Sequence, residues 1–132
     1  MADQTIILCP GQGAQHVGMG RAWAGQFDVA RRTFDEADEA LGLGLSKICF
    51  DGPAQQVTRT DVAQAAIYVT SVACVRALTQ AGELPDEPVA TAGLSLGEYT
   101  ALHLAGALGF ADGLKHVRQR GQFMQAAAEA AA

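Results

Sequence analysis

The feature that most constrains the fold is the segment GLSLG at residues 93–97, which stands between a short apolar run and a helical pattern. Residues 89–93 predict a buried strand, and the helix that follows is predicted to run from residue 97 to about residue 105. A glycine on each side of the central serine suits a sharp strand-to-helix turn, because neighbouring backbone passes too close for a β-carbon. The chain is therefore expected to form a strand, a tight turn and a helix in that order.

The rest of the chain repeats this alternation of strands and helices. An apolar run predicts a second buried strand at residues 5–9, and helical spacing predicts helices over 21–26, 28–41, 45–50, 60–81 and 111–132. Strands separated by helices fit an α/β fold with a parallel sheet in one domain. Two strands are few for a sheet, and they would leave apolar faces exposed. We therefore expect the sheet to be completed by further chain.

Composition narrows the class of protein. The 132 residues carry a formal net charge of -5, are 49% hydrophobic and 17% charged, and so favour a folded domain over disorder. Basic residues are scattered, so no nucleic-acid partner is expected. Residues 1–4 lack the basic region of a secretory signal, and no apolar stretch is expected to approach the length needed to span a membrane. The three cysteines match no zinc spacing, which predicts buried reduced thiols, no metal site and a cytoplasmic location.

Ser95 is the candidate nucleophile. The glycine-flanked turn would hold it in a strained conformation, with its hydroxyl projecting from the edge of the sheet. The backbone amide of Leu96, at the N-terminus of the next helix, could donate to an oxyanion. The alternative is a chance match of the pentapeptide in a loop. A predicted strand before the serine and a helix after it favour the nucleophile.

A nucleophilic serine needs a general base, and none of the three histidines is a convincing one. His103 lies eight residues along the helix from Ser95, about 12 Å further along the axis, so it cannot reach the hydroxyl. His116 is predicted to face solvent or to pack within the last helix. Distance does not exclude His16, which follows the glycine-rich turn at residues 11–15, but we interpret it as a loop histidine. The sequence therefore indicates that the base comes from another segment.

A second glycine-rich turn, GQGAQ at residues 11–15, follows the first predicted strand. It lacks the lysine of a P-loop and the spacing of a dinucleotide fingerprint, so alone it indicates only a chain reversal. Loops at the carboxyl ends of neighbouring parallel strands, however, gather at one edge of the sheet. The turn is therefore expected to face Ser95, where the amide of Gln12 could be a second oxyanion donor.

Two arginines, Arg118 and Arg120, lie on the last predicted helix. The commonest state of such residues is a solvated surface charge. The alternative is that one of them points inward and holds an anion, since the guanidinium fork can bond both oxygens of a carboxylate. Composition and spacing alone favour the solvated state.

Four segments together resemble the malonyl-CoA:acyl-carrier-protein transacylase family. They are PGQGAQ at 10–15, DVAQAAI at 61–67, GLSLGEY at 93–99 and RGQFMQ at 120–125. They follow in order along nearly the whole chain. The resemblance implies a partial α/β-hydrolase-like acyltransferase core with parallel strands and flanking helices. Residues 1–132 would be the N-terminal portion of its large subdomain.

The resemblance also implies site roles and a ping-pong reaction of fatty-acid biosynthesis. Ser95 would take a malonyl group from malonyl-CoA and pass it to the phosphopantetheine thiol of acyl carrier protein. The amides of Gln12 and Leu96 would form the oxyanion hole, and Arg120 would bind the free malonyl carboxylate, while Arg118 would stay solvated. Malonyl-CoA and acyl carrier protein are thus the expected partners. No cofactor is expected, because malonyl-CoA is a substrate.

The chain departs from the family's pattern at two points. Leu94 stands where many members have a histidine before the nucleophile, and we expect little effect on the chemistry. The family's general-base histidine and its small ferredoxin-like subdomain come further downstream, and neither falls within these 132 residues. We therefore expect this chain alone to be inactive or very weakly active, with the missing C-terminal segment as a further partner.

Other functions share some of these features. An esterase-type serine hydrolase has the same turn but usually no carboxylate-binding arginine. An acyltransferase domain of a large synthase would carry the same motifs. A non-catalytic interaction fragment is favoured by the absent base and the alanine-rich end, whereas the retention of Ser95 and Arg120 favours an enzyme.

Overall fold

The computed structural model describes residues 4–132, in which five helices lie between two strands and two more helices follow the second strand. The elements are β1 (Ile6–Cys9), α1 (Arg21–Gln26), α2 (Asp28–Leu41), α3 (Leu45–Asp51), α4 (Ala54–Thr58), α5 (Thr60–Gln80), β2 (Ala90–Gly93), α6 (Leu96–Leu104) and α7 (Phe110–Ala131). The expected α/β fold with a parallel sheet and many helices is thus confirmed. Residues 1–3, which bear on the expected lack of a secretory signal, lie outside the described residues.

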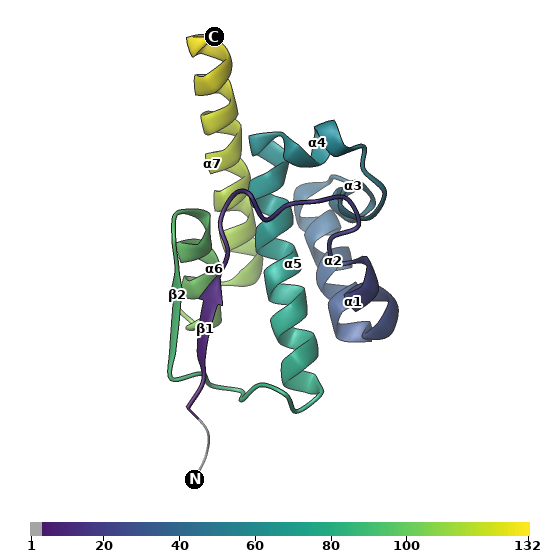
Figure 1. Ribbon diagram of the computed structural model, residues 1–132, viewed down its shortest axis with the longest axis vertical. Coiled ribbons are helices and arrows are strands. Elements are labelled where there is room, and N and C mark those ends of the chain that lie inside the picture. Colours follow the sequence, from purple (N-terminus) through teal and green to yellow (C-terminus); the bar gives the residue numbers. More distant parts are fainter. Residues whose placement is uncertain (1–3) are drawn as a thin grey trace.

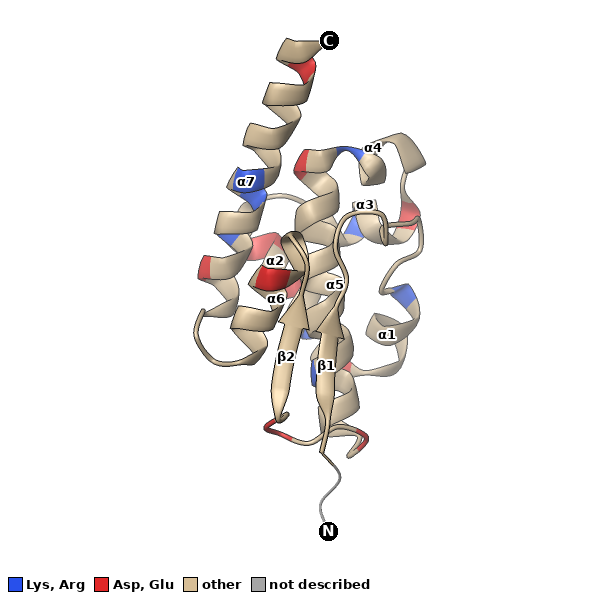
Figure 2. Ribbon diagram, turned by 60° about the vertical axis from the view of Figure 1, so that its left-hand side comes forward, with Lys and Arg blue, Asp and Glu red and all other residues tan. Residues whose placement is uncertain are grey.

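The sheet consists of β1 and β2, paired in parallel with Ile6 opposite Ala90 and Cys9 opposite Gly93. The helices lie behind it, and neither strand carries a charged residue (Figure 2). We predicted two buried strands, and the outer face contradicts this, because Ile6 is 61% and Leu8 77% exposed. Side chains alternate between the two faces of a strand, and within the described residues helices cover only one face.

Helix α5 is the centre of the molecule, with α2 and α7 packed along it (Figure 1). All residues from Val62 to Val69 are buried, so this helix is apolar around most of its circumference. By length and composition α5 could cross a membrane, so the expectation that no apolar stretch approaches that length was wrong. However, 61% of the apolar window is buried inside the molecule, as in the core helix of a globular domain.

Two glycines let α7 approach α5 closely. A β-carbon on Gly121 would lie 2.8 Å from the carbonyl oxygen of Thr60, and one on Gly113 would lie 2.4 Å from the hydroxyl of Tyr68. That hydroxyl donates to the carbonyl oxygen of Phe110 at 3.0 Å, at the start of α7. Beyond Gly121 the side chains of α7 are largely exposed, and its last turns project from the molecule (Figure 1).

Helix α4 was not predicted from the sequence. It has only five residues and one buried side chain, Val57, so it has no apolar periodicity to detect. It leads from α3 into α5 and places Thr60, the first residue of α5, near the turn that follows β1.

Candidate active site

Ser95 occupies the tight turn between β2 and α6 that the sequence predicts. Its backbone angles are φ 58° and ψ -114°, and it is the one residue other than glycine with positive φ in the described chain. Such a conformation costs free energy and persists only where the surroundings impose it. The side chain is exposed, so the hydroxyl is open to a reactant.

The two flanking glycines are required by packing. A β-carbon on Gly93 would lie 2.2 Å from the carbonyl carbon and oxygen of Gly97, across the turn. One on Gly97 would lie 2.3 Å from the carbonyl oxygen of Cys9, at the end of β1. The start of α6 therefore packs directly against the end of β1. This close packing constrains the backbone of Ser95, which lies between the two glycines.

Leu96 is the first residue of α6, and its side chain is fully buried. The first amides of a helix have no partner within the helix, and the helix dipole places partial positive charge at this end. The amide of Leu96 is therefore available, one residue after the Ser95 hydroxyl, for an oxyanion.

The glycine-rich turn after β1 lies beside the turn at Ser95, as predicted. A β-carbon on Gly11 would lie 2.9 Å from the carbonyl oxygen of Leu94. The Gln12 side chain donates from Nε2 to Thr60 Oγ1 at 3.0 Å, and its Oε1 accepts from Gln64 Nε2 at 3.3 Å. These two bonds join the turn to the first two turns of α5.

Arg120 comes from α7 and reaches Ser95. Its Nη2 donates to Ser95 Oγ at 2.9 Å, and its Nη1 donates to Gln64 Oε1 at 2.6 Å. The guanidinium carbon lies 5.6 Å from the ring centroid of Tyr99, one turn into α6. The structure therefore brings Ser95, Gln12 and Arg120, which are far apart in the sequence, into one hydrogen-bonded group.

Arg118, two residues earlier on α7, points elsewhere. It donates to the carbonyl oxygen of Asp61, and its Nη1 lies 3.8 Å from the Asp61 carboxylate. We expected Arg118 to be solvated, and this is wrong, because its side chain is only 21% exposed. The Asp61 residue at the start of α5 offers a carbonyl oxygen and a carboxylate to the Arg118 guanidinium, and these contacts hold the side chain against the protein.

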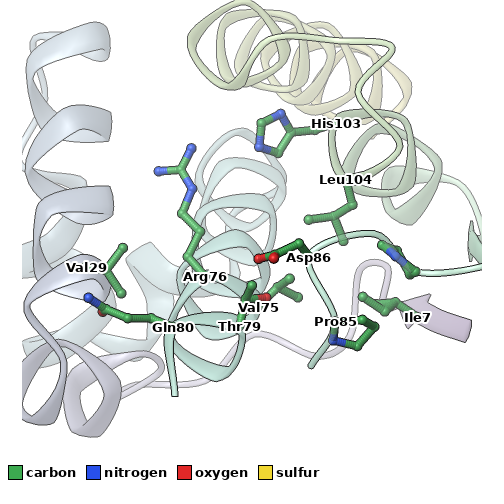
Figure 3. A pocket seen from close by; sticks show the side chains of 11 residues that line it. Ile7, Val29, Val75, Arg76, Thr79, Gln80, Pro85, Asp86, His103 and Leu104 are labelled. Atoms are coloured by element: carbon green, nitrogen blue, oxygen red, sulfur yellow. The ribbon is translucent and has the colours of Figure 1, made fainter. Parts of the chain in front are cut away.

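Within residues 4–132, no histidine bonds to Ser95. His16 and His116 each donate from Nδ1 to a backbone carbonyl in their own segment, Ala14 at 3.2 Å and Asp112 at 2.6 Å. His103 donates to Leu108 at 2.8 Å. Figure 3 shows its ring near Arg76 in a pocket of about 450 Å³, and neither turn contributes a residue to that pocket.

Gln64 is the site residue that sequence reasoning missed. It contacts both Gln12 and Arg120, although the sequence suggested no role for it. The signal was present, because Gln64 is the one polar amide in a run of apolar residues from 62 to 67. A lone polar side chain on an otherwise buried helix must find partners, and here they are the site residues.

The cysteines lie apart from this group as free thiols. Cys9 and Cys49 are buried, as predicted, whereas Cys74 is half-buried. Burial raises the pKa of each thiol, and for Cys49 burial together with the nearby Asp38 carboxylate raises the pKa to about 12. In residues 4–132, no group of three or more His, Cys, Asp or Glu could hold a metal ion.

The family described as "Acyl transferase domain" matches residues 6–132. A malonyl CoA-acyl carrier protein transacylase of Bacillus subtilis is 48% identical over 97% of this chain and 39% of its own length. That of Escherichia coli K12 is 42% identical over 94% of this chain and 40% of its own length. The chain thus spans about two fifths of the relatives that it matches.

Solved structures agree. The malonyl CoA-acyl carrier protein transacylase of Clostridium perfringens superposes with a TM-score of 0.86 at 40% identity, over 93% of this chain and 38% of that one. A type II PKS acyl-carrier protein in complex with its malonyl-transacylase gives 0.87 at 37% identity, over 95% and 40%. The chain therefore belongs to the acyl transferase domain family, as a stretch similar to the N-terminal part of malonyl-CoA:acyl-carrier-protein transacylases.

Proposed function

We propose that this chain carries the nucleophile and carboxylate-binding half of a malonyl-CoA:acyl-carrier-protein transacylase. The observation that carries the proposal is the 2.9 Å hydrogen bond from Arg120 Nη2 to Ser95 Oγ. A malonyl group esterified to Ser95 ends in a free carboxylate a few bonds from the ester. A guanidinium one hydrogen bond from the hydroxyl is well placed to receive it, because an arginine fork can bond both carboxylate oxygens.

The proposed reaction has two steps, and both pass through Ser95. In the first, Ser95 Oγ attacks the thioester carbonyl of malonyl-CoA, the carbon–sulfur bond breaks, and coenzyme A leaves as the thiol with the serine proton. In the second, the phosphopantetheine thiol of acyl carrier protein attacks the malonyl ester, and Ser95 recovers a proton. Neither step needs a cofactor, since malonyl-CoA is a substrate.

Each step develops negative charge on the carbonyl oxygen, and we assign its stabilisation to the backbone amides of Leu96 and Gln12. Leu96 offers the free amide of a helix N-terminus next to the nucleophile. The contact between Gly11 and Leu94 supports the assignment of Gln12, because it puts the two turns side by side. Loss of one oxyanion donor typically costs about 10²–10³ in rate.

We assign the general base to chain beyond residue 132. The three histidines in the described part of the chain are bonded to backbone carbonyls, which supports a base from elsewhere. The 132 residues would be the N-terminal portion of an α/β-hydrolase-like large subdomain, without the ferredoxin-like subdomain. The exposed outer face of β1 supports a further segment as a partner. Alone, the chain would transfer malonyl slowly or not at all, and reduced thiols favour a cytoplasmic location.

The test is to incubate the chain with malonyl-CoA and record its intact mass over time. We expect a slowly formed malonyl adduct that is absent from Ser95→Ala. Arg120→Ala should slow its formation by about 10-fold to 100-fold, the value of a hydrogen bond to a charged group. Arg118→Ala is the matched control, because it removes a guanidinium of the same helix that faces Asp61.

The alternatives give different results in the same experiment. An esterase-type hydrolase would turn over nitrophenyl esters with Arg120→Ala as fast as with the parent chain. A non-catalytic fragment would form no adduct even when the downstream segment is supplied. Either result would refute the proposed function.

A further inference from the structure

Gln64 is a buried polar side chain of the site, at 1% exposure. Both ends of its amide are used. Its Oε1 accepts from Arg120 Nη1 at 2.6 Å, while its Nε2 donates to Gln12 Oε1 at 3.3 Å and to Met124 Sδ at 3.4 Å. A buried amide with this many partners has a single favourable orientation.

The direction of these bonds is set by Arg120. A guanidinium only donates, so the Gln64 oxygen must face it and the Gln64 nitrogen must face Gln12. Gln12 then accepts through its oxygen, which turns its own nitrogen toward Thr60 Oγ1 at 3.0 Å. The result is one directed chain of hydrogen bonds from Arg120 through Gln64 and Gln12 to Thr60.

This chain of hydrogen bonds occupies Nη1 of the Arg120 guanidinium and leaves Nη2 to bond the substrate. With Nη1 held by Gln64, Nη2 points at Ser95 Oγ. Arginine otherwise loses a large rotamer entropy when it is fixed, so an anchored guanidinium binds a carboxylate more strongly than a free one. Helix α5 supplies the anchor from the core of the molecule, where it cannot move independently.

We propose that Gln64 is a positioning residue that sets malonyl selectivity, by fixing Arg120 against the turn that carries Gln12. The inference rests on the proposed function and adds to it the residue that makes Arg120 selective. Without Gln64, the guanidinium would still be present but would no longer be held in line with a malonyl carboxylate. Binding of a thioester that lacks the carboxylate would change little.

The test uses Gln64→Leu, which is similar in size and removes the hydrogen bonds to Arg120, Gln12 and Met124, and Gln64→Glu, which keeps the acceptor for Arg120. Thr33→Val is the matched control, since Thr33 is a buried hydroxyl that accepts from a different arginine, Arg76. The first readout is the NMR signals of the Arg120 guanidinium N–H groups without substrate. We expect restricted rotation in the parent, Thr33→Val and Gln64→Glu, and averaged signals in Gln64→Leu.

The second readout is the ratio of malonyl-CoA to acetyl-CoA affinity, measured by calorimetry in a Ser95→Ala background so that no transfer occurs. We expect Gln64→Leu to lower this ratio by about tenfold, through weaker malonyl-CoA binding, and Thr33→Val to retain it. Equal weakening of both ligands, an unchanged ratio, or no preference in the parent would overturn the proposal. Absence of a malonyl adduct on Ser95 even with the downstream segment supplied would instead count against the proposed function.

Discussion

The helices and the sheet of this molecule bury their apolar side chains to different degrees. In the helical half, α5 is enclosed by α2 and α7, and residues such as Leu114 and Val69 are fully buried. In the part of the sheet that the structure describes, β1 and β2 have helices on one face, and Leu8 is 77% exposed on the other. Both strands contain apolar residues, as the helices do, so their burial depends on what covers them. The helical half buries its own apolar residues, whereas the sheet leaves apolar side chains of β1 exposed.

The candidate site lies where the two halves meet. Ser95 comes from the end of a strand, Gln64 from the central helix and Arg120 from the helix packed beside it. The polar bonds among them tie the sheet edge to the helical half. The site can therefore be pre-formed even though the outer face of the sheet is bare.

The largest effect is expected at the junction, from Gly97→Ala. The new β-carbon would lie 2.3 Å from the carbonyl oxygen of Cys9, and backbone on both sides cannot give way cheaply. We expect the free energy of unfolding to fall by about 3 kcal/mol or more, at the upper end for overpacking. Urea unfolding followed by circular dichroism measures this.

The control for Gly97→Ala is Gly25→Ala. Gly25 lies in α1, and a β-carbon there would meet nothing within 4 Å. Alanine is the better helix former by about 1 kcal/mol, so this variant should be as stable as the parent or more so. A Gly97→Ala chain of unchanged stability would show that the strand and α6 are not tightly joined.

The positions of the helices and strands in both halves could be predicted from the sequence better than the burial of their side chains. Both strands and all helices but α4 follow from apolar spacing and from glycine and proline stops. The apolar run alone predicted a buried strand at β1, because such a run has the same appearance whether one face or both are covered. The small number of strands, in contrast, correctly indicated that apolar faces would be exposed. Helix α4 is too short to give any periodicity.

For the site, the sequence located the backbone features and not the side-chain partners. The strained turn at Ser95 and its contact with the turn at Gln12 follow from glycine spacing and parallel-strand geometry. That Arg120 points inward was implied only by resemblance, and the pairing of Arg118 with Asp61 was missed. Both depend on the rotation of α7 against α5, which is set by tertiary packing at Gly121.

The next largest effect is expected from truncating a leucine in each half, Leu114→Ala in the helical half and Leu8→Ala in the sheet. Leu114 is fully buried, so its truncation leaves a cavity and should cost about 3 kcal/mol of unfolding free energy. Leu8 faces outward, and its truncation should stay within about 0.5 kcal/mol. Denaturant midpoints of the two variants measure the difference. Similar losses would mean that the outer face of the sheet is covered, for example by a second copy of the chain.

The smallest effect is a fall in stability at alkaline pH that should arise mainly in the helical half. The pKa of Cys49 is raised to about 12, first by burial and then by Asp38, from an ordinary value of 9.0. A raised folded-state pKa means that the thiol stabilises the fold below pH 9, and that this contribution is lost as the pH rises toward 12. One group can change stability by no more than about 1.4 kcal/mol per pH unit.

The buried thiol at the end of β1 provides the comparison, since burial also raises the pKa of Cys9. We expect Cys49→Ala to flatten the dependence of unfolding free energy on pH between 9 and 11 more than Cys9→Ala does, because Cys49 is fully enclosed and has a carboxylate nearby. Denaturant unfolding at a series of pH values checks this. An equal or larger flattening in Cys9→Ala would mean that the end of β1 is as well enclosed as the core, which would remove the contrast between the two halves at that point.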